Sequence, residues 1–312
     1  MSGDRVDGPP ETVVVKCGGS GALDVDRLCE DVAVLRAAGR RVVLVHGGSA
    51  EMSRLAEQLG VELRYLTAPD GVVTRYTDAA TLDVLTLALA GRVKPTLLRA
   101  LDRHGVRAVG LTGLDSGLLR ARRKKAVRAV VEGRVTVVRD DRSGRIVGVD
   151  AGLLHDLLAA GVVPVVSPPA LAEDGEPVNV NADRAAAAVA AALRADSLLF
   201  LTGAPGVLTD PTDPASALAA YQLPQPGEPA PSWVRGGMTI KLVAAREALL
   251  AGVPSVWISD GGAAHPLKAV TGEGPGTRVT LPGPRSERPA PEAQGPTPEA
   301  ERPTPEAQRP SR

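Results

Sequence analysis

Short runs of Val, Leu and Ile alternate along the chain with longer stretches whose apolar positions recur with a helical period. The runs are continuously apolar, which is typical of parallel strands buried on both faces. They predict strands at 12–16, 41–45, 107–109, 162–166, 197–201 and 255–258, and helices at 26–38, 50–59, 78–90, 93–103, 151–160, 182–194 and 239–251. This order predicts an α/β fold, an αβα sandwich around a mostly parallel central sheet. Ligands would then bind beyond the carboxyl ends of the strands.

Three segments depart from this pattern. Residues 126–150 alternate in polarity and contain turn residues, so they predict an antiparallel β-hairpin beside the sheet. Residues 210–233 are rich in proline and predict a loop. After residue 281 a Pro-rich repeat has no apolar face, so we expect residues 282–312 to be a disordered tail. The tail would follow two halves, at 11–195 and 196–281.

Composition excludes several classes of protein. The chain has 36 basic and 36 acidic residues and only 2% aromatic residues, so neither charge nor base stacking favours nucleic-acid binding. No run approaches the roughly 18 apolar residues of a membrane-spanning helix, and the first residues lack the apolar core of a signal peptide. Cys17 and Cys29 have neither metal-ligand spacing nor a disulfide framework. We therefore expect a cytoplasmic protein that binds neither nucleic acid nor membrane and has no metal site of its own.

Two stretches repeat one plan, a buried strand, a glycine pair and a helix: "VVVKCGGSGALD" at 13–24 and "VVLVHGGSAEMS" at 42–53. Glycine turns expose amide groups beside a helix N-terminus, which favours phosphate. Such turns also occur as plain tight connections, and neither matches a P-loop or a dinucleotide motif. However, Lys16 precedes Gly18 and Gly19, and a parallel sheet would bring Gly47 and Gly48 to the same crevice. The two turns therefore predict a phosphate cradle.

Charged residues open two later helices. In "VNVNAD" Asp183 precedes an Ala-rich helix, where it could simply favour the positive helix N-terminus. In "GGMTIKL" Lys241 lies close to a helix N-terminus, which is unfavourable unless the lysine meets an anion. Together with Lys16, these residues predict a site that neutralises an anionic transition state.

These stretches resemble the amino acid kinase family over about residues 12–280. The segments "KCGGS", "VHGGS", "VNVNAD" and "GGMTIKL" have the order and spacing of acetylglutamate kinases. "VHGGSAE", "GVVTRYTDAATLDVL", "VGLTGLDSG" and "RARRKKAV" look closer to kinases that act on glutamate or 2-aminoadipate attached to a small LysW-type amino-group carrier protein. The resemblance implies ATP-dependent phosphorylation of a side-chain carboxylate to an acyl phosphate, with Mg²⁺ on the ATP.

The resemblance also implies roles for residues. Lys16, Asp183 and Lys241 would be catalytic, the glycine pairs would bind phosphate, and Arg75 and Asn179 would hold the substrate. The implied nucleotide contacts are Thr202, Gly203, Gly206 and Gly237. Residues 11–195 would bind the acyl substrate and 196–281 the nucleotide. The helix at 78–90 is apolar around most of its circumference and corresponds to a subunit-joining helix, so a homodimer is expected; burial within one subunit is the alternative.

A cluster of basic residues follows the "GLTGLDSG" loop, which the resemblance places at the acyl substrate. It comprises Arg120, Arg122, Arg123, Lys124 and Lys125. Such a run is ordinarily a solvated surface. Here we interpret it as the contact for a small acidic carrier protein, steered by charge. Two other functions stay open: acetylglutamate kinase acting on the free substrate, and a non-catalytic nucleotide- or amino-acid-binding regulator. The chain also departs from its relatives at Lys94, where an Asn is common.

Overall fold

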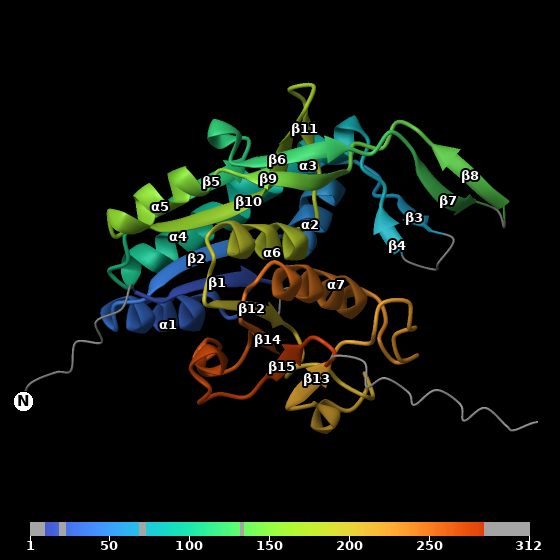
Figure 1. Ribbon diagram of the computed structural model, residues 1–312. Coiled ribbons are helices and arrows are strands. Elements are labelled where there is room, and N and C mark those ends of the chain that lie inside the picture. Colours follow the sequence, from blue (N-terminus) through green and yellow to red (C-terminus); the bar gives the residue numbers. More distant parts are fainter. Residues whose placement is uncertain (1–9, 19–22, 69–72, 132–133, 284–312) are drawn as a thin grey trace, which may run out of the picture. The chain divides into compact units, whose positions relative to one another are not determined.

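The computed structural model describes residues 10–18, 23–68, 73–131 and 134–283 (Figure 1). The strands of its main sheet are β1 (Thr12–Cys17), β2 (Arg41–His46), β5 (Ala108–Gly113), β6 (Leu119–Arg123), β9 (Gly144–Val149), β10 (Val163–Ala172), β11 (Pro177–Val178), β12 (Ser197–Thr202), β13 (Ala220–Gln222), β14 (Ser255–Asp260) and β15 (Thr277–Thr280). They lie in the order β13-β15-β14-β12-β1-β2-β10-β6-β9, and β5 and β11 also pair with β10.

The helices are α1 (Val25–Ala37), α2 (Ser49–Leu59), α3 (Ala79–Ala88), α4 (Lys94–Arg103), α5 (Ala151–Ala159), α6 (Ala182–Ala192) and α7 (Gly237–Leu250). Short turns of helix occur at η1 (Leu89–Val93), η2 (Asp115–Gly117), η3 (Pro214–Ser216) and η4 (Lys268–Thr271). The two helices predicted at 78–90 and 93–103 join through η1, a π-helical turn. Pro95 is tolerated there because it lies in the first turn of α4.

The central strands are parallel, as predicted. β1 pairs in parallel with β2 and β12, β2 with β10, and β12 with β14. All six predicted strands and all seven predicted helices are present, with ends that differ by a few residues. The predicted αβα sandwich with a mostly parallel sheet is therefore confirmed.

Two hydrophobic cores cover the two faces of the sheet. Val13 and Val15 pack into the core beneath α1 and α4, whereas Val14 packs into the core beneath α5, α6 and α7. Helices α6 and α7 lie side by side over the second face (Figure 1). Side chains alternate along a strand, so Lys16 faces α6 and α7 while Cys17 faces α1 and α4. This alternation decides which face of the sheet each polar side chain at the strand ends occupies.

A second sheet lies beside the main one (Figure 1). It consists of β3 (Tyr65–Thr67), β4 (Val73–Arg75), β7 (Val127–Val131) and β8 (Arg134–Val138), in the order β4-β3-β7-β8. The hairpin predicted within 126–150 is the β7–β8 pair. The end of that segment was not foreseen as a separate strand: β9 pairs antiparallel with β6 in the main sheet.

The loop predicted at 210–233 is wrong in part. It contains η3 and the strand β13, which pairs in parallel with β15, a further strand that was not predicted. Tyr221 in β13 is only 6% exposed, and its ring packs edge-on against Trp233 at 5.7 Å. Tertiary packing therefore orders a segment whose proline content indicated a loop.

Helix α3 buries one side rather than its whole circumference. Leu82, Val84 and Leu85 pack in a small core shared with α2 and η1, while Leu87 is 55% exposed. The predicted homodimer and the division at residue 195 stay predictions. The predicted tail lies outside the described residues beyond Gly283. Among the described helices, none combines the length and apolarity needed to cross a membrane.

The close approach of β5 to β10 and β6 makes a specific demand on one glycine. A Cβ atom on Gly113 would lie 2.6 Å from the Pro169 carbonyl oxygen and 2.7 Å from Leu119 Cβ. We expect Gly113→Ala to lower the free energy of unfolding by about 1–3 kcal/mol through overpacking.

Gly91→Ala is the matched control, because no described atom outside its chain neighbours and its own helix backbone lies within 4 Å of its Cβ position. Its α-helix-favouring side chain should leave stability unchanged or raise it by up to about 1 kcal/mol. Denaturant unfolding measures both, and equal effects would contradict the packing argument.

Candidate active site

One buried carboxylate holds two lysines from different elements. Asp183 Oδ1 lies 2.8 Å from Lys16 Nζ, and Asp183 Oδ2 lies 3.5 Å from Lys241 Nζ. Lys16 comes from β1, Asp183 from the first turn of α6 and Lys241 from the second turn of α7. The structure thus brings together the three residues that the sequence singled out as catalytic.

The position of Asp183 is set by the start of α6. Asn181 is the N-cap, and its side-chain oxygen accepts from the backbone amides of Asp183 and Arg184 at 2.9 and 3.1 Å. The positive end of the helix also favours the carboxylate charge. Asp183 is therefore both a helix-terminal carboxylate and a partner of the two lysines, so the two interpretations of the sequence are compatible.

The charges of this cluster do not balance. Two ammonium groups face one carboxylate, and the Lys16 and Asp183 side chains are each only 7% exposed. Burial holds the pKa of Lys241 below its ordinary value, the negative charge of Asp183 opposes that shift, and the Lys16 charge adds to it. A buried excess of one positive charge is costly unless an anion binds beside it. The cluster is therefore suited to an anionic ligand.

Both glycine turns lie at the carboxyl edge of the sheet beside this cluster. Gly18 follows β1, and Gly47 and Gly48 follow β2; the register pairs Cys17 with His46, so the turns are neighbours. The Gly47 amide donates to the Cys17 carbonyl at 3.5 Å. A Cβ on Gly18 would lie 2.8 Å from the Leu201 carbonyl oxygen, so this turn requires glycine. Gly19 lies outside the described residues.

The two predicted substrate residues share a neighbour. Asn179 Nδ2 donates to Thr77 Oγ1 at 3.0 Å, and Thr77 Oγ1 donates to the Arg75 carbonyl at 3.4 Å. The Arg75 guanidinium contacts Met52 Sδ at 2.7 Å and lies over the Tyr65 ring. Within the described residues, the buried Arg75 Nε has no hydrogen-bond partner. Thr77 therefore links the Asn179 side chain to the Arg75 backbone, and one donor of the Arg75 guanidinium is unpartnered among the described residues.

Of the four predicted nucleotide residues, two lie on β12 and α7 and two lie in the loop after β12. Thr202 ends β12, with Gly203 exposed just after it, and Gly237 begins α7. Gly206 is buried, and a Cβ there would overlap the Thr277 side chain, so its lack of a side chain has a packing cause. Their contacts with a nucleotide stay predictions.

The basic cluster lies on and just after β6, the strand next to the edge strand β9. Its residues do not all lie on one face of β6. Arg120 and Arg122 are exposed on one face of β6, while Arg123 is half-buried on the other and donates to the Asp141 carbonyl at 3.5 Å. Arg122 pairs with Glu173 at 3.2 Å. Lys124 and Lys125, just beyond the strand, are exposed. Arg120 lies against Gly117, within the "GLDSG" loop.

Two buried polar residues near the site, His46 and Lys94, were not among the predicted site residues. His46 is 1% exposed, and burial lowers its pKa to about 4. Lys94 is 5% exposed, donates to the Leu111 carbonyl at 2.6 Å, and has its pKa lowered by burial to about 8. The signals were a histidine directly before a glycine pair and a lysine in place of the relatives' asparagine. Across the described ranges, no group of three His, Cys, Asp or Glu side chains is arranged to hold a metal ion.

Several proteins are similar in sequence to this chain over most of its length. It is 41% identical to a [LysW]-aminoadipate kinase of Deinococcus radiodurans over 84% of the chain and 90% of the relative. It is 38% identical to a [LysW]-aminoadipate kinase of Thermus thermophilus, over 84% and 98%. It is 37% identical to an acetylglutamate kinase of Symbiobacterium thermophilum, over 86% and 91%.

Solved structures share the fold. The N-acetylglutamate synthase of Neisseria gonorrhoeae matches with a TM-score of 0.67 and 26% identity, over 86% of this chain and 59% of that one. Giardia carbamate kinase matches with a TM-score of 0.61 and 16% identity, over 88% and 100%. The model of the amino acid kinase family matches residues 11–260. The predictions of a kinase and of its family are confirmed: the chain belongs to the amino acid kinase family.

Proposed function

We propose that the protein transfers the γ-phosphoryl group of ATP to the side-chain carboxylate of glutamate or 2-aminoadipate, whose amino group is attached to a small acidic carrier protein. The observation that carries this proposal is the Asp183 carboxylate bridging Lys16 and Lys241 beside two glycine turns. Names of the relatives in Deinococcus and Thermus support the carrier-linked substrate.

The reaction needs positioning and charge neutralisation rather than a covalent enzyme intermediate. A carboxylate oxygen of the substrate attacks the γ-phosphorus, forming an O–P bond, while the P–O bond to ADP breaks and ADP leaves. The substrate is already ionised, so no proton has to move. Lys16 and Lys241 donate to oxygens of the transferring group, and the amides of Gly18 and Gly48 add neutral donors.

Asp183 acts through the lysines. By forming ion pairs with both, it fixes their ammonium groups at one point before the phosphates arrive, so little reorganisation is needed during transfer. ATP would meet this point from the β12 and α7 side. Mg²⁺ would be held mainly by the phosphate oxygens, where it supplies further neutralising charge.

Arg75 and Asn179 suit the other end of the substrate. The unpartnered Arg75 Nε can donate to a carboxylate, and Asn179 can meet an amide group. Arg120, Arg122, Lys124 and Lys125 are exposed cations on and just after β6, and Arg120 lies against the "GLDSG" loop; this arrangement suits an acidic carrier. A homodimer through α3 is part of the same proposal.

One alternative has a specific observation in its favour. The 37% identity to an acetylglutamate kinase supports the same chemistry on free N-acetylglutamate. A regulator without catalysis is disfavoured, because sensing a nucleotide does not require two buried lysines on one carboxylate.

The activity is tested by trapping the acyl phosphate with hydroxylamine, which converts it to a hydroxamate. We expect hydroxamate from the carrier-linked substrate, and Lys16→Ala and Lys241→Ala should each lower turnover at least about 100-fold, as loss of one donor to developing charge does. Lys268→Ala, at an exposed lysine, is the control and should retain activity. Hydroxamate at wild-type rates from either active-site variant would remove that lysine from the mechanism.

The pH dependence tests the role of Asp183. Its negative charge raises the pKa of Lys241 against the effect of burial, so Asp183→Asn should lower that pKa. Lys241 would then lose its proton at lower pH, and the alkaline limb of the residual turnover should move to lower pH. Lys241→Arg should move this limb to higher pH, because a guanidinium stays charged. An alkaline limb that is the same in all three proteins would contradict the proposed charge requirement.

Charge reversal separates carrier-linked from free substrate. Replacing Arg122, Lys124 and Lys125 by Glu should lower kcat/KM for the carrier-linked substrate and leave the KM for ATP unchanged. The loss should shrink between about 50 and about 500 mM salt, which shortens the Debye length roughly threefold. The matched control reverses the exposed Arg99, Lys268 and Arg278 instead. If both triple variants act alike, or if free N-acetylglutamate is preferred, the carrier proposal fails.

A further inference from the structure

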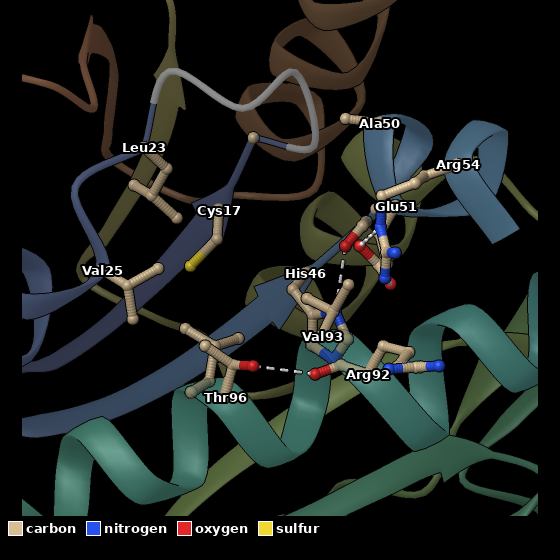
Figure 2. A pocket seen from close by; sticks show the side chains of 14 residues that line it. Cys17, Leu23, Val25, His46, Ala50, Glu51, Arg54, Arg92, Val93 and Thr96 are labelled. Atoms are coloured by element: carbon tan, nitrogen blue, oxygen red, sulfur yellow. Dashed lines mark hydrogen bonds and ion pairs between the residues drawn. The ribbon is translucent and has the colours of Figure 1, made fainter.

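A cavity of about 400 Å³ lies at the carboxyl ends of β1 and β2, between the starts of α1 and α2 and the junction of η1 with α4 (Figure 2). Leu23, Val25, Val93 and Leu97 give it apolar walls. Arg54 and Arg92 also line it. Its volume suits a small organic molecule.

This cavity is distinct from the lysine cluster. Cys17 and His46 line it, and they are paired across β1 and β2, one position beyond Lys16 and Val45. Successive side chains alternate between faces, so the cavity lies on the α1 and α4 face while Lys16 faces α6. Gly18, Gly47 and Gly48 of the two glycine turns also line the cavity.

The cavity contains a buried acceptor without a donor. His46 Nδ1 lies 3.0 Å from the Gly47 carbonyl oxygen; a carbonyl can only accept, so Nδ1 carries the proton. Nε2 therefore presents a bare lone pair. Although the side chain is 1% exposed, no described residue donates to Nε2. A buried acceptor of this kind requires a donor from elsewhere.

The charges around His46 determine whether that donor can be cationic or has to be neutral. The positive charges of Lys94 and Lys16 act on His46 in addition to burial. A cationic donor would be repelled there, whereas a neutral hydroxyl or amide N–H would not. The same field attracts a negative group elsewhere on the ligand.

The cavity also offers an anion site. Arg92 forms no ion pair within the described part of the chain, although its charge acts on the Glu51 carboxyl, which also lines the cavity and holds Arg54 Nε at 3.0 Å. Helix α2 begins at the cavity, and its N-cap residue is Gly48, which has no side chain to accept from the first amides. A positive helix end and an unpaired guanidinium both favour a carboxylate.

We propose that this cavity is an effector site for a small monocarboxylate that carries a neutral hydroxyl or amide donor at its other end. The donor meets His46 Nε2, the apolar middle packs between Val93 and Leu97, and the carboxylate meets Arg92 and the start of α2. Because the ligand lies against the turns of Gly18, Gly47 and Gly48, its binding changes phosphoryl transfer. The effector role rests on the proposed kinase activity, but the binding site does not.

The probe is 4-hydroxyphenylacetate, with phenylacetate lacking the hydroxyl and 2-(4-hydroxyphenyl)ethanol lacking the carboxylate as matched controls. On the full chain labelled with ¹⁵N-histidine, we expect a saturable upfield shift of the His46 Nε2 resonance. Each control should bind at least about fivefold more weakly, as expected for the loss of one hydrogen bond. A His46 resonance that does not move would overturn the proposal.

Variants distinguish this cavity from the substrate site. Calorimetry should show at least about fivefold weaker binding to Arg92→Gln. Arg99→Gln, on the adjoining helix α4 but not among the residues that line the cavity, and Arg75→Gln should bind as the wild type does. Loss of binding in Arg75→Gln with retention in Arg92→Gln would place the probe at the substrate site and overturn the proposal. Binding at His46 without any change in kcat at saturating ATP would overturn the effector role alone.

Discussion

The organisation of this molecule depends on one buried carboxylate that must neutralise two ammonium groups. Lys16, Asp183 and Lys241 come from a strand and from two helices that are far apart in sequence, and each is largely shielded from water. Because isolated buried charges are costly, this contact ties the end of β1 to the starts of α6 and α7. It also leaves one positive charge in excess at the edge of the sheet where the glycine turns lie. An anion is the group that completes this balance.

Because side chains alternate along β1 and β2, consecutive residues of each strand lie in two different environments, one on each face of the sheet. Lys16 enters the face covered by α6 and α7, and Cys17 and His46 enter the face covered by α1 and α4. The glycine turns belong to both environments, since they follow β1 and β2 beside the predicted phosphate site while Gly18, Gly47 and Gly48 line the second cavity. A ligand on one face can therefore act on the chemistry of the other without touching substrate.

The parallel core and the meeting of Lys16, Asp183 and Lys241 were predictable because each has a local signal: continuous apolar runs, paired glycines, and charged residues where helices begin. The strands β13, β15 and β9 were not, since their order comes from packing such as that of Tyr221 on Trp233 and from pairing with distant strands. The basic cluster was predicted as one patch, yet strand alternation divides Arg122 from Arg123. Whether His46 Nε2 has a hydrogen-bond partner depends on every residue around the ring. The position of His46 before the glycine pair could therefore indicate the residue but not its missing partner among the described residues.

The central claim is that Lys16 and Lys241 act on one phosphoryl group at a point fixed by Asp183. The most direct measurement is a crystal structure of the protein with ADP, Mg²⁺, aluminium fluoride and the acceptor substrate, in which the fluoride complex stands in for the transferring phosphoryl group. The account predicts that both Nζ atoms lie within hydrogen-bond distance of its fluorines and that Asp183 still contacts both lysines. A phosphoryl mimic bound away from either lysine, with the Asp183 bridge intact, would contradict it.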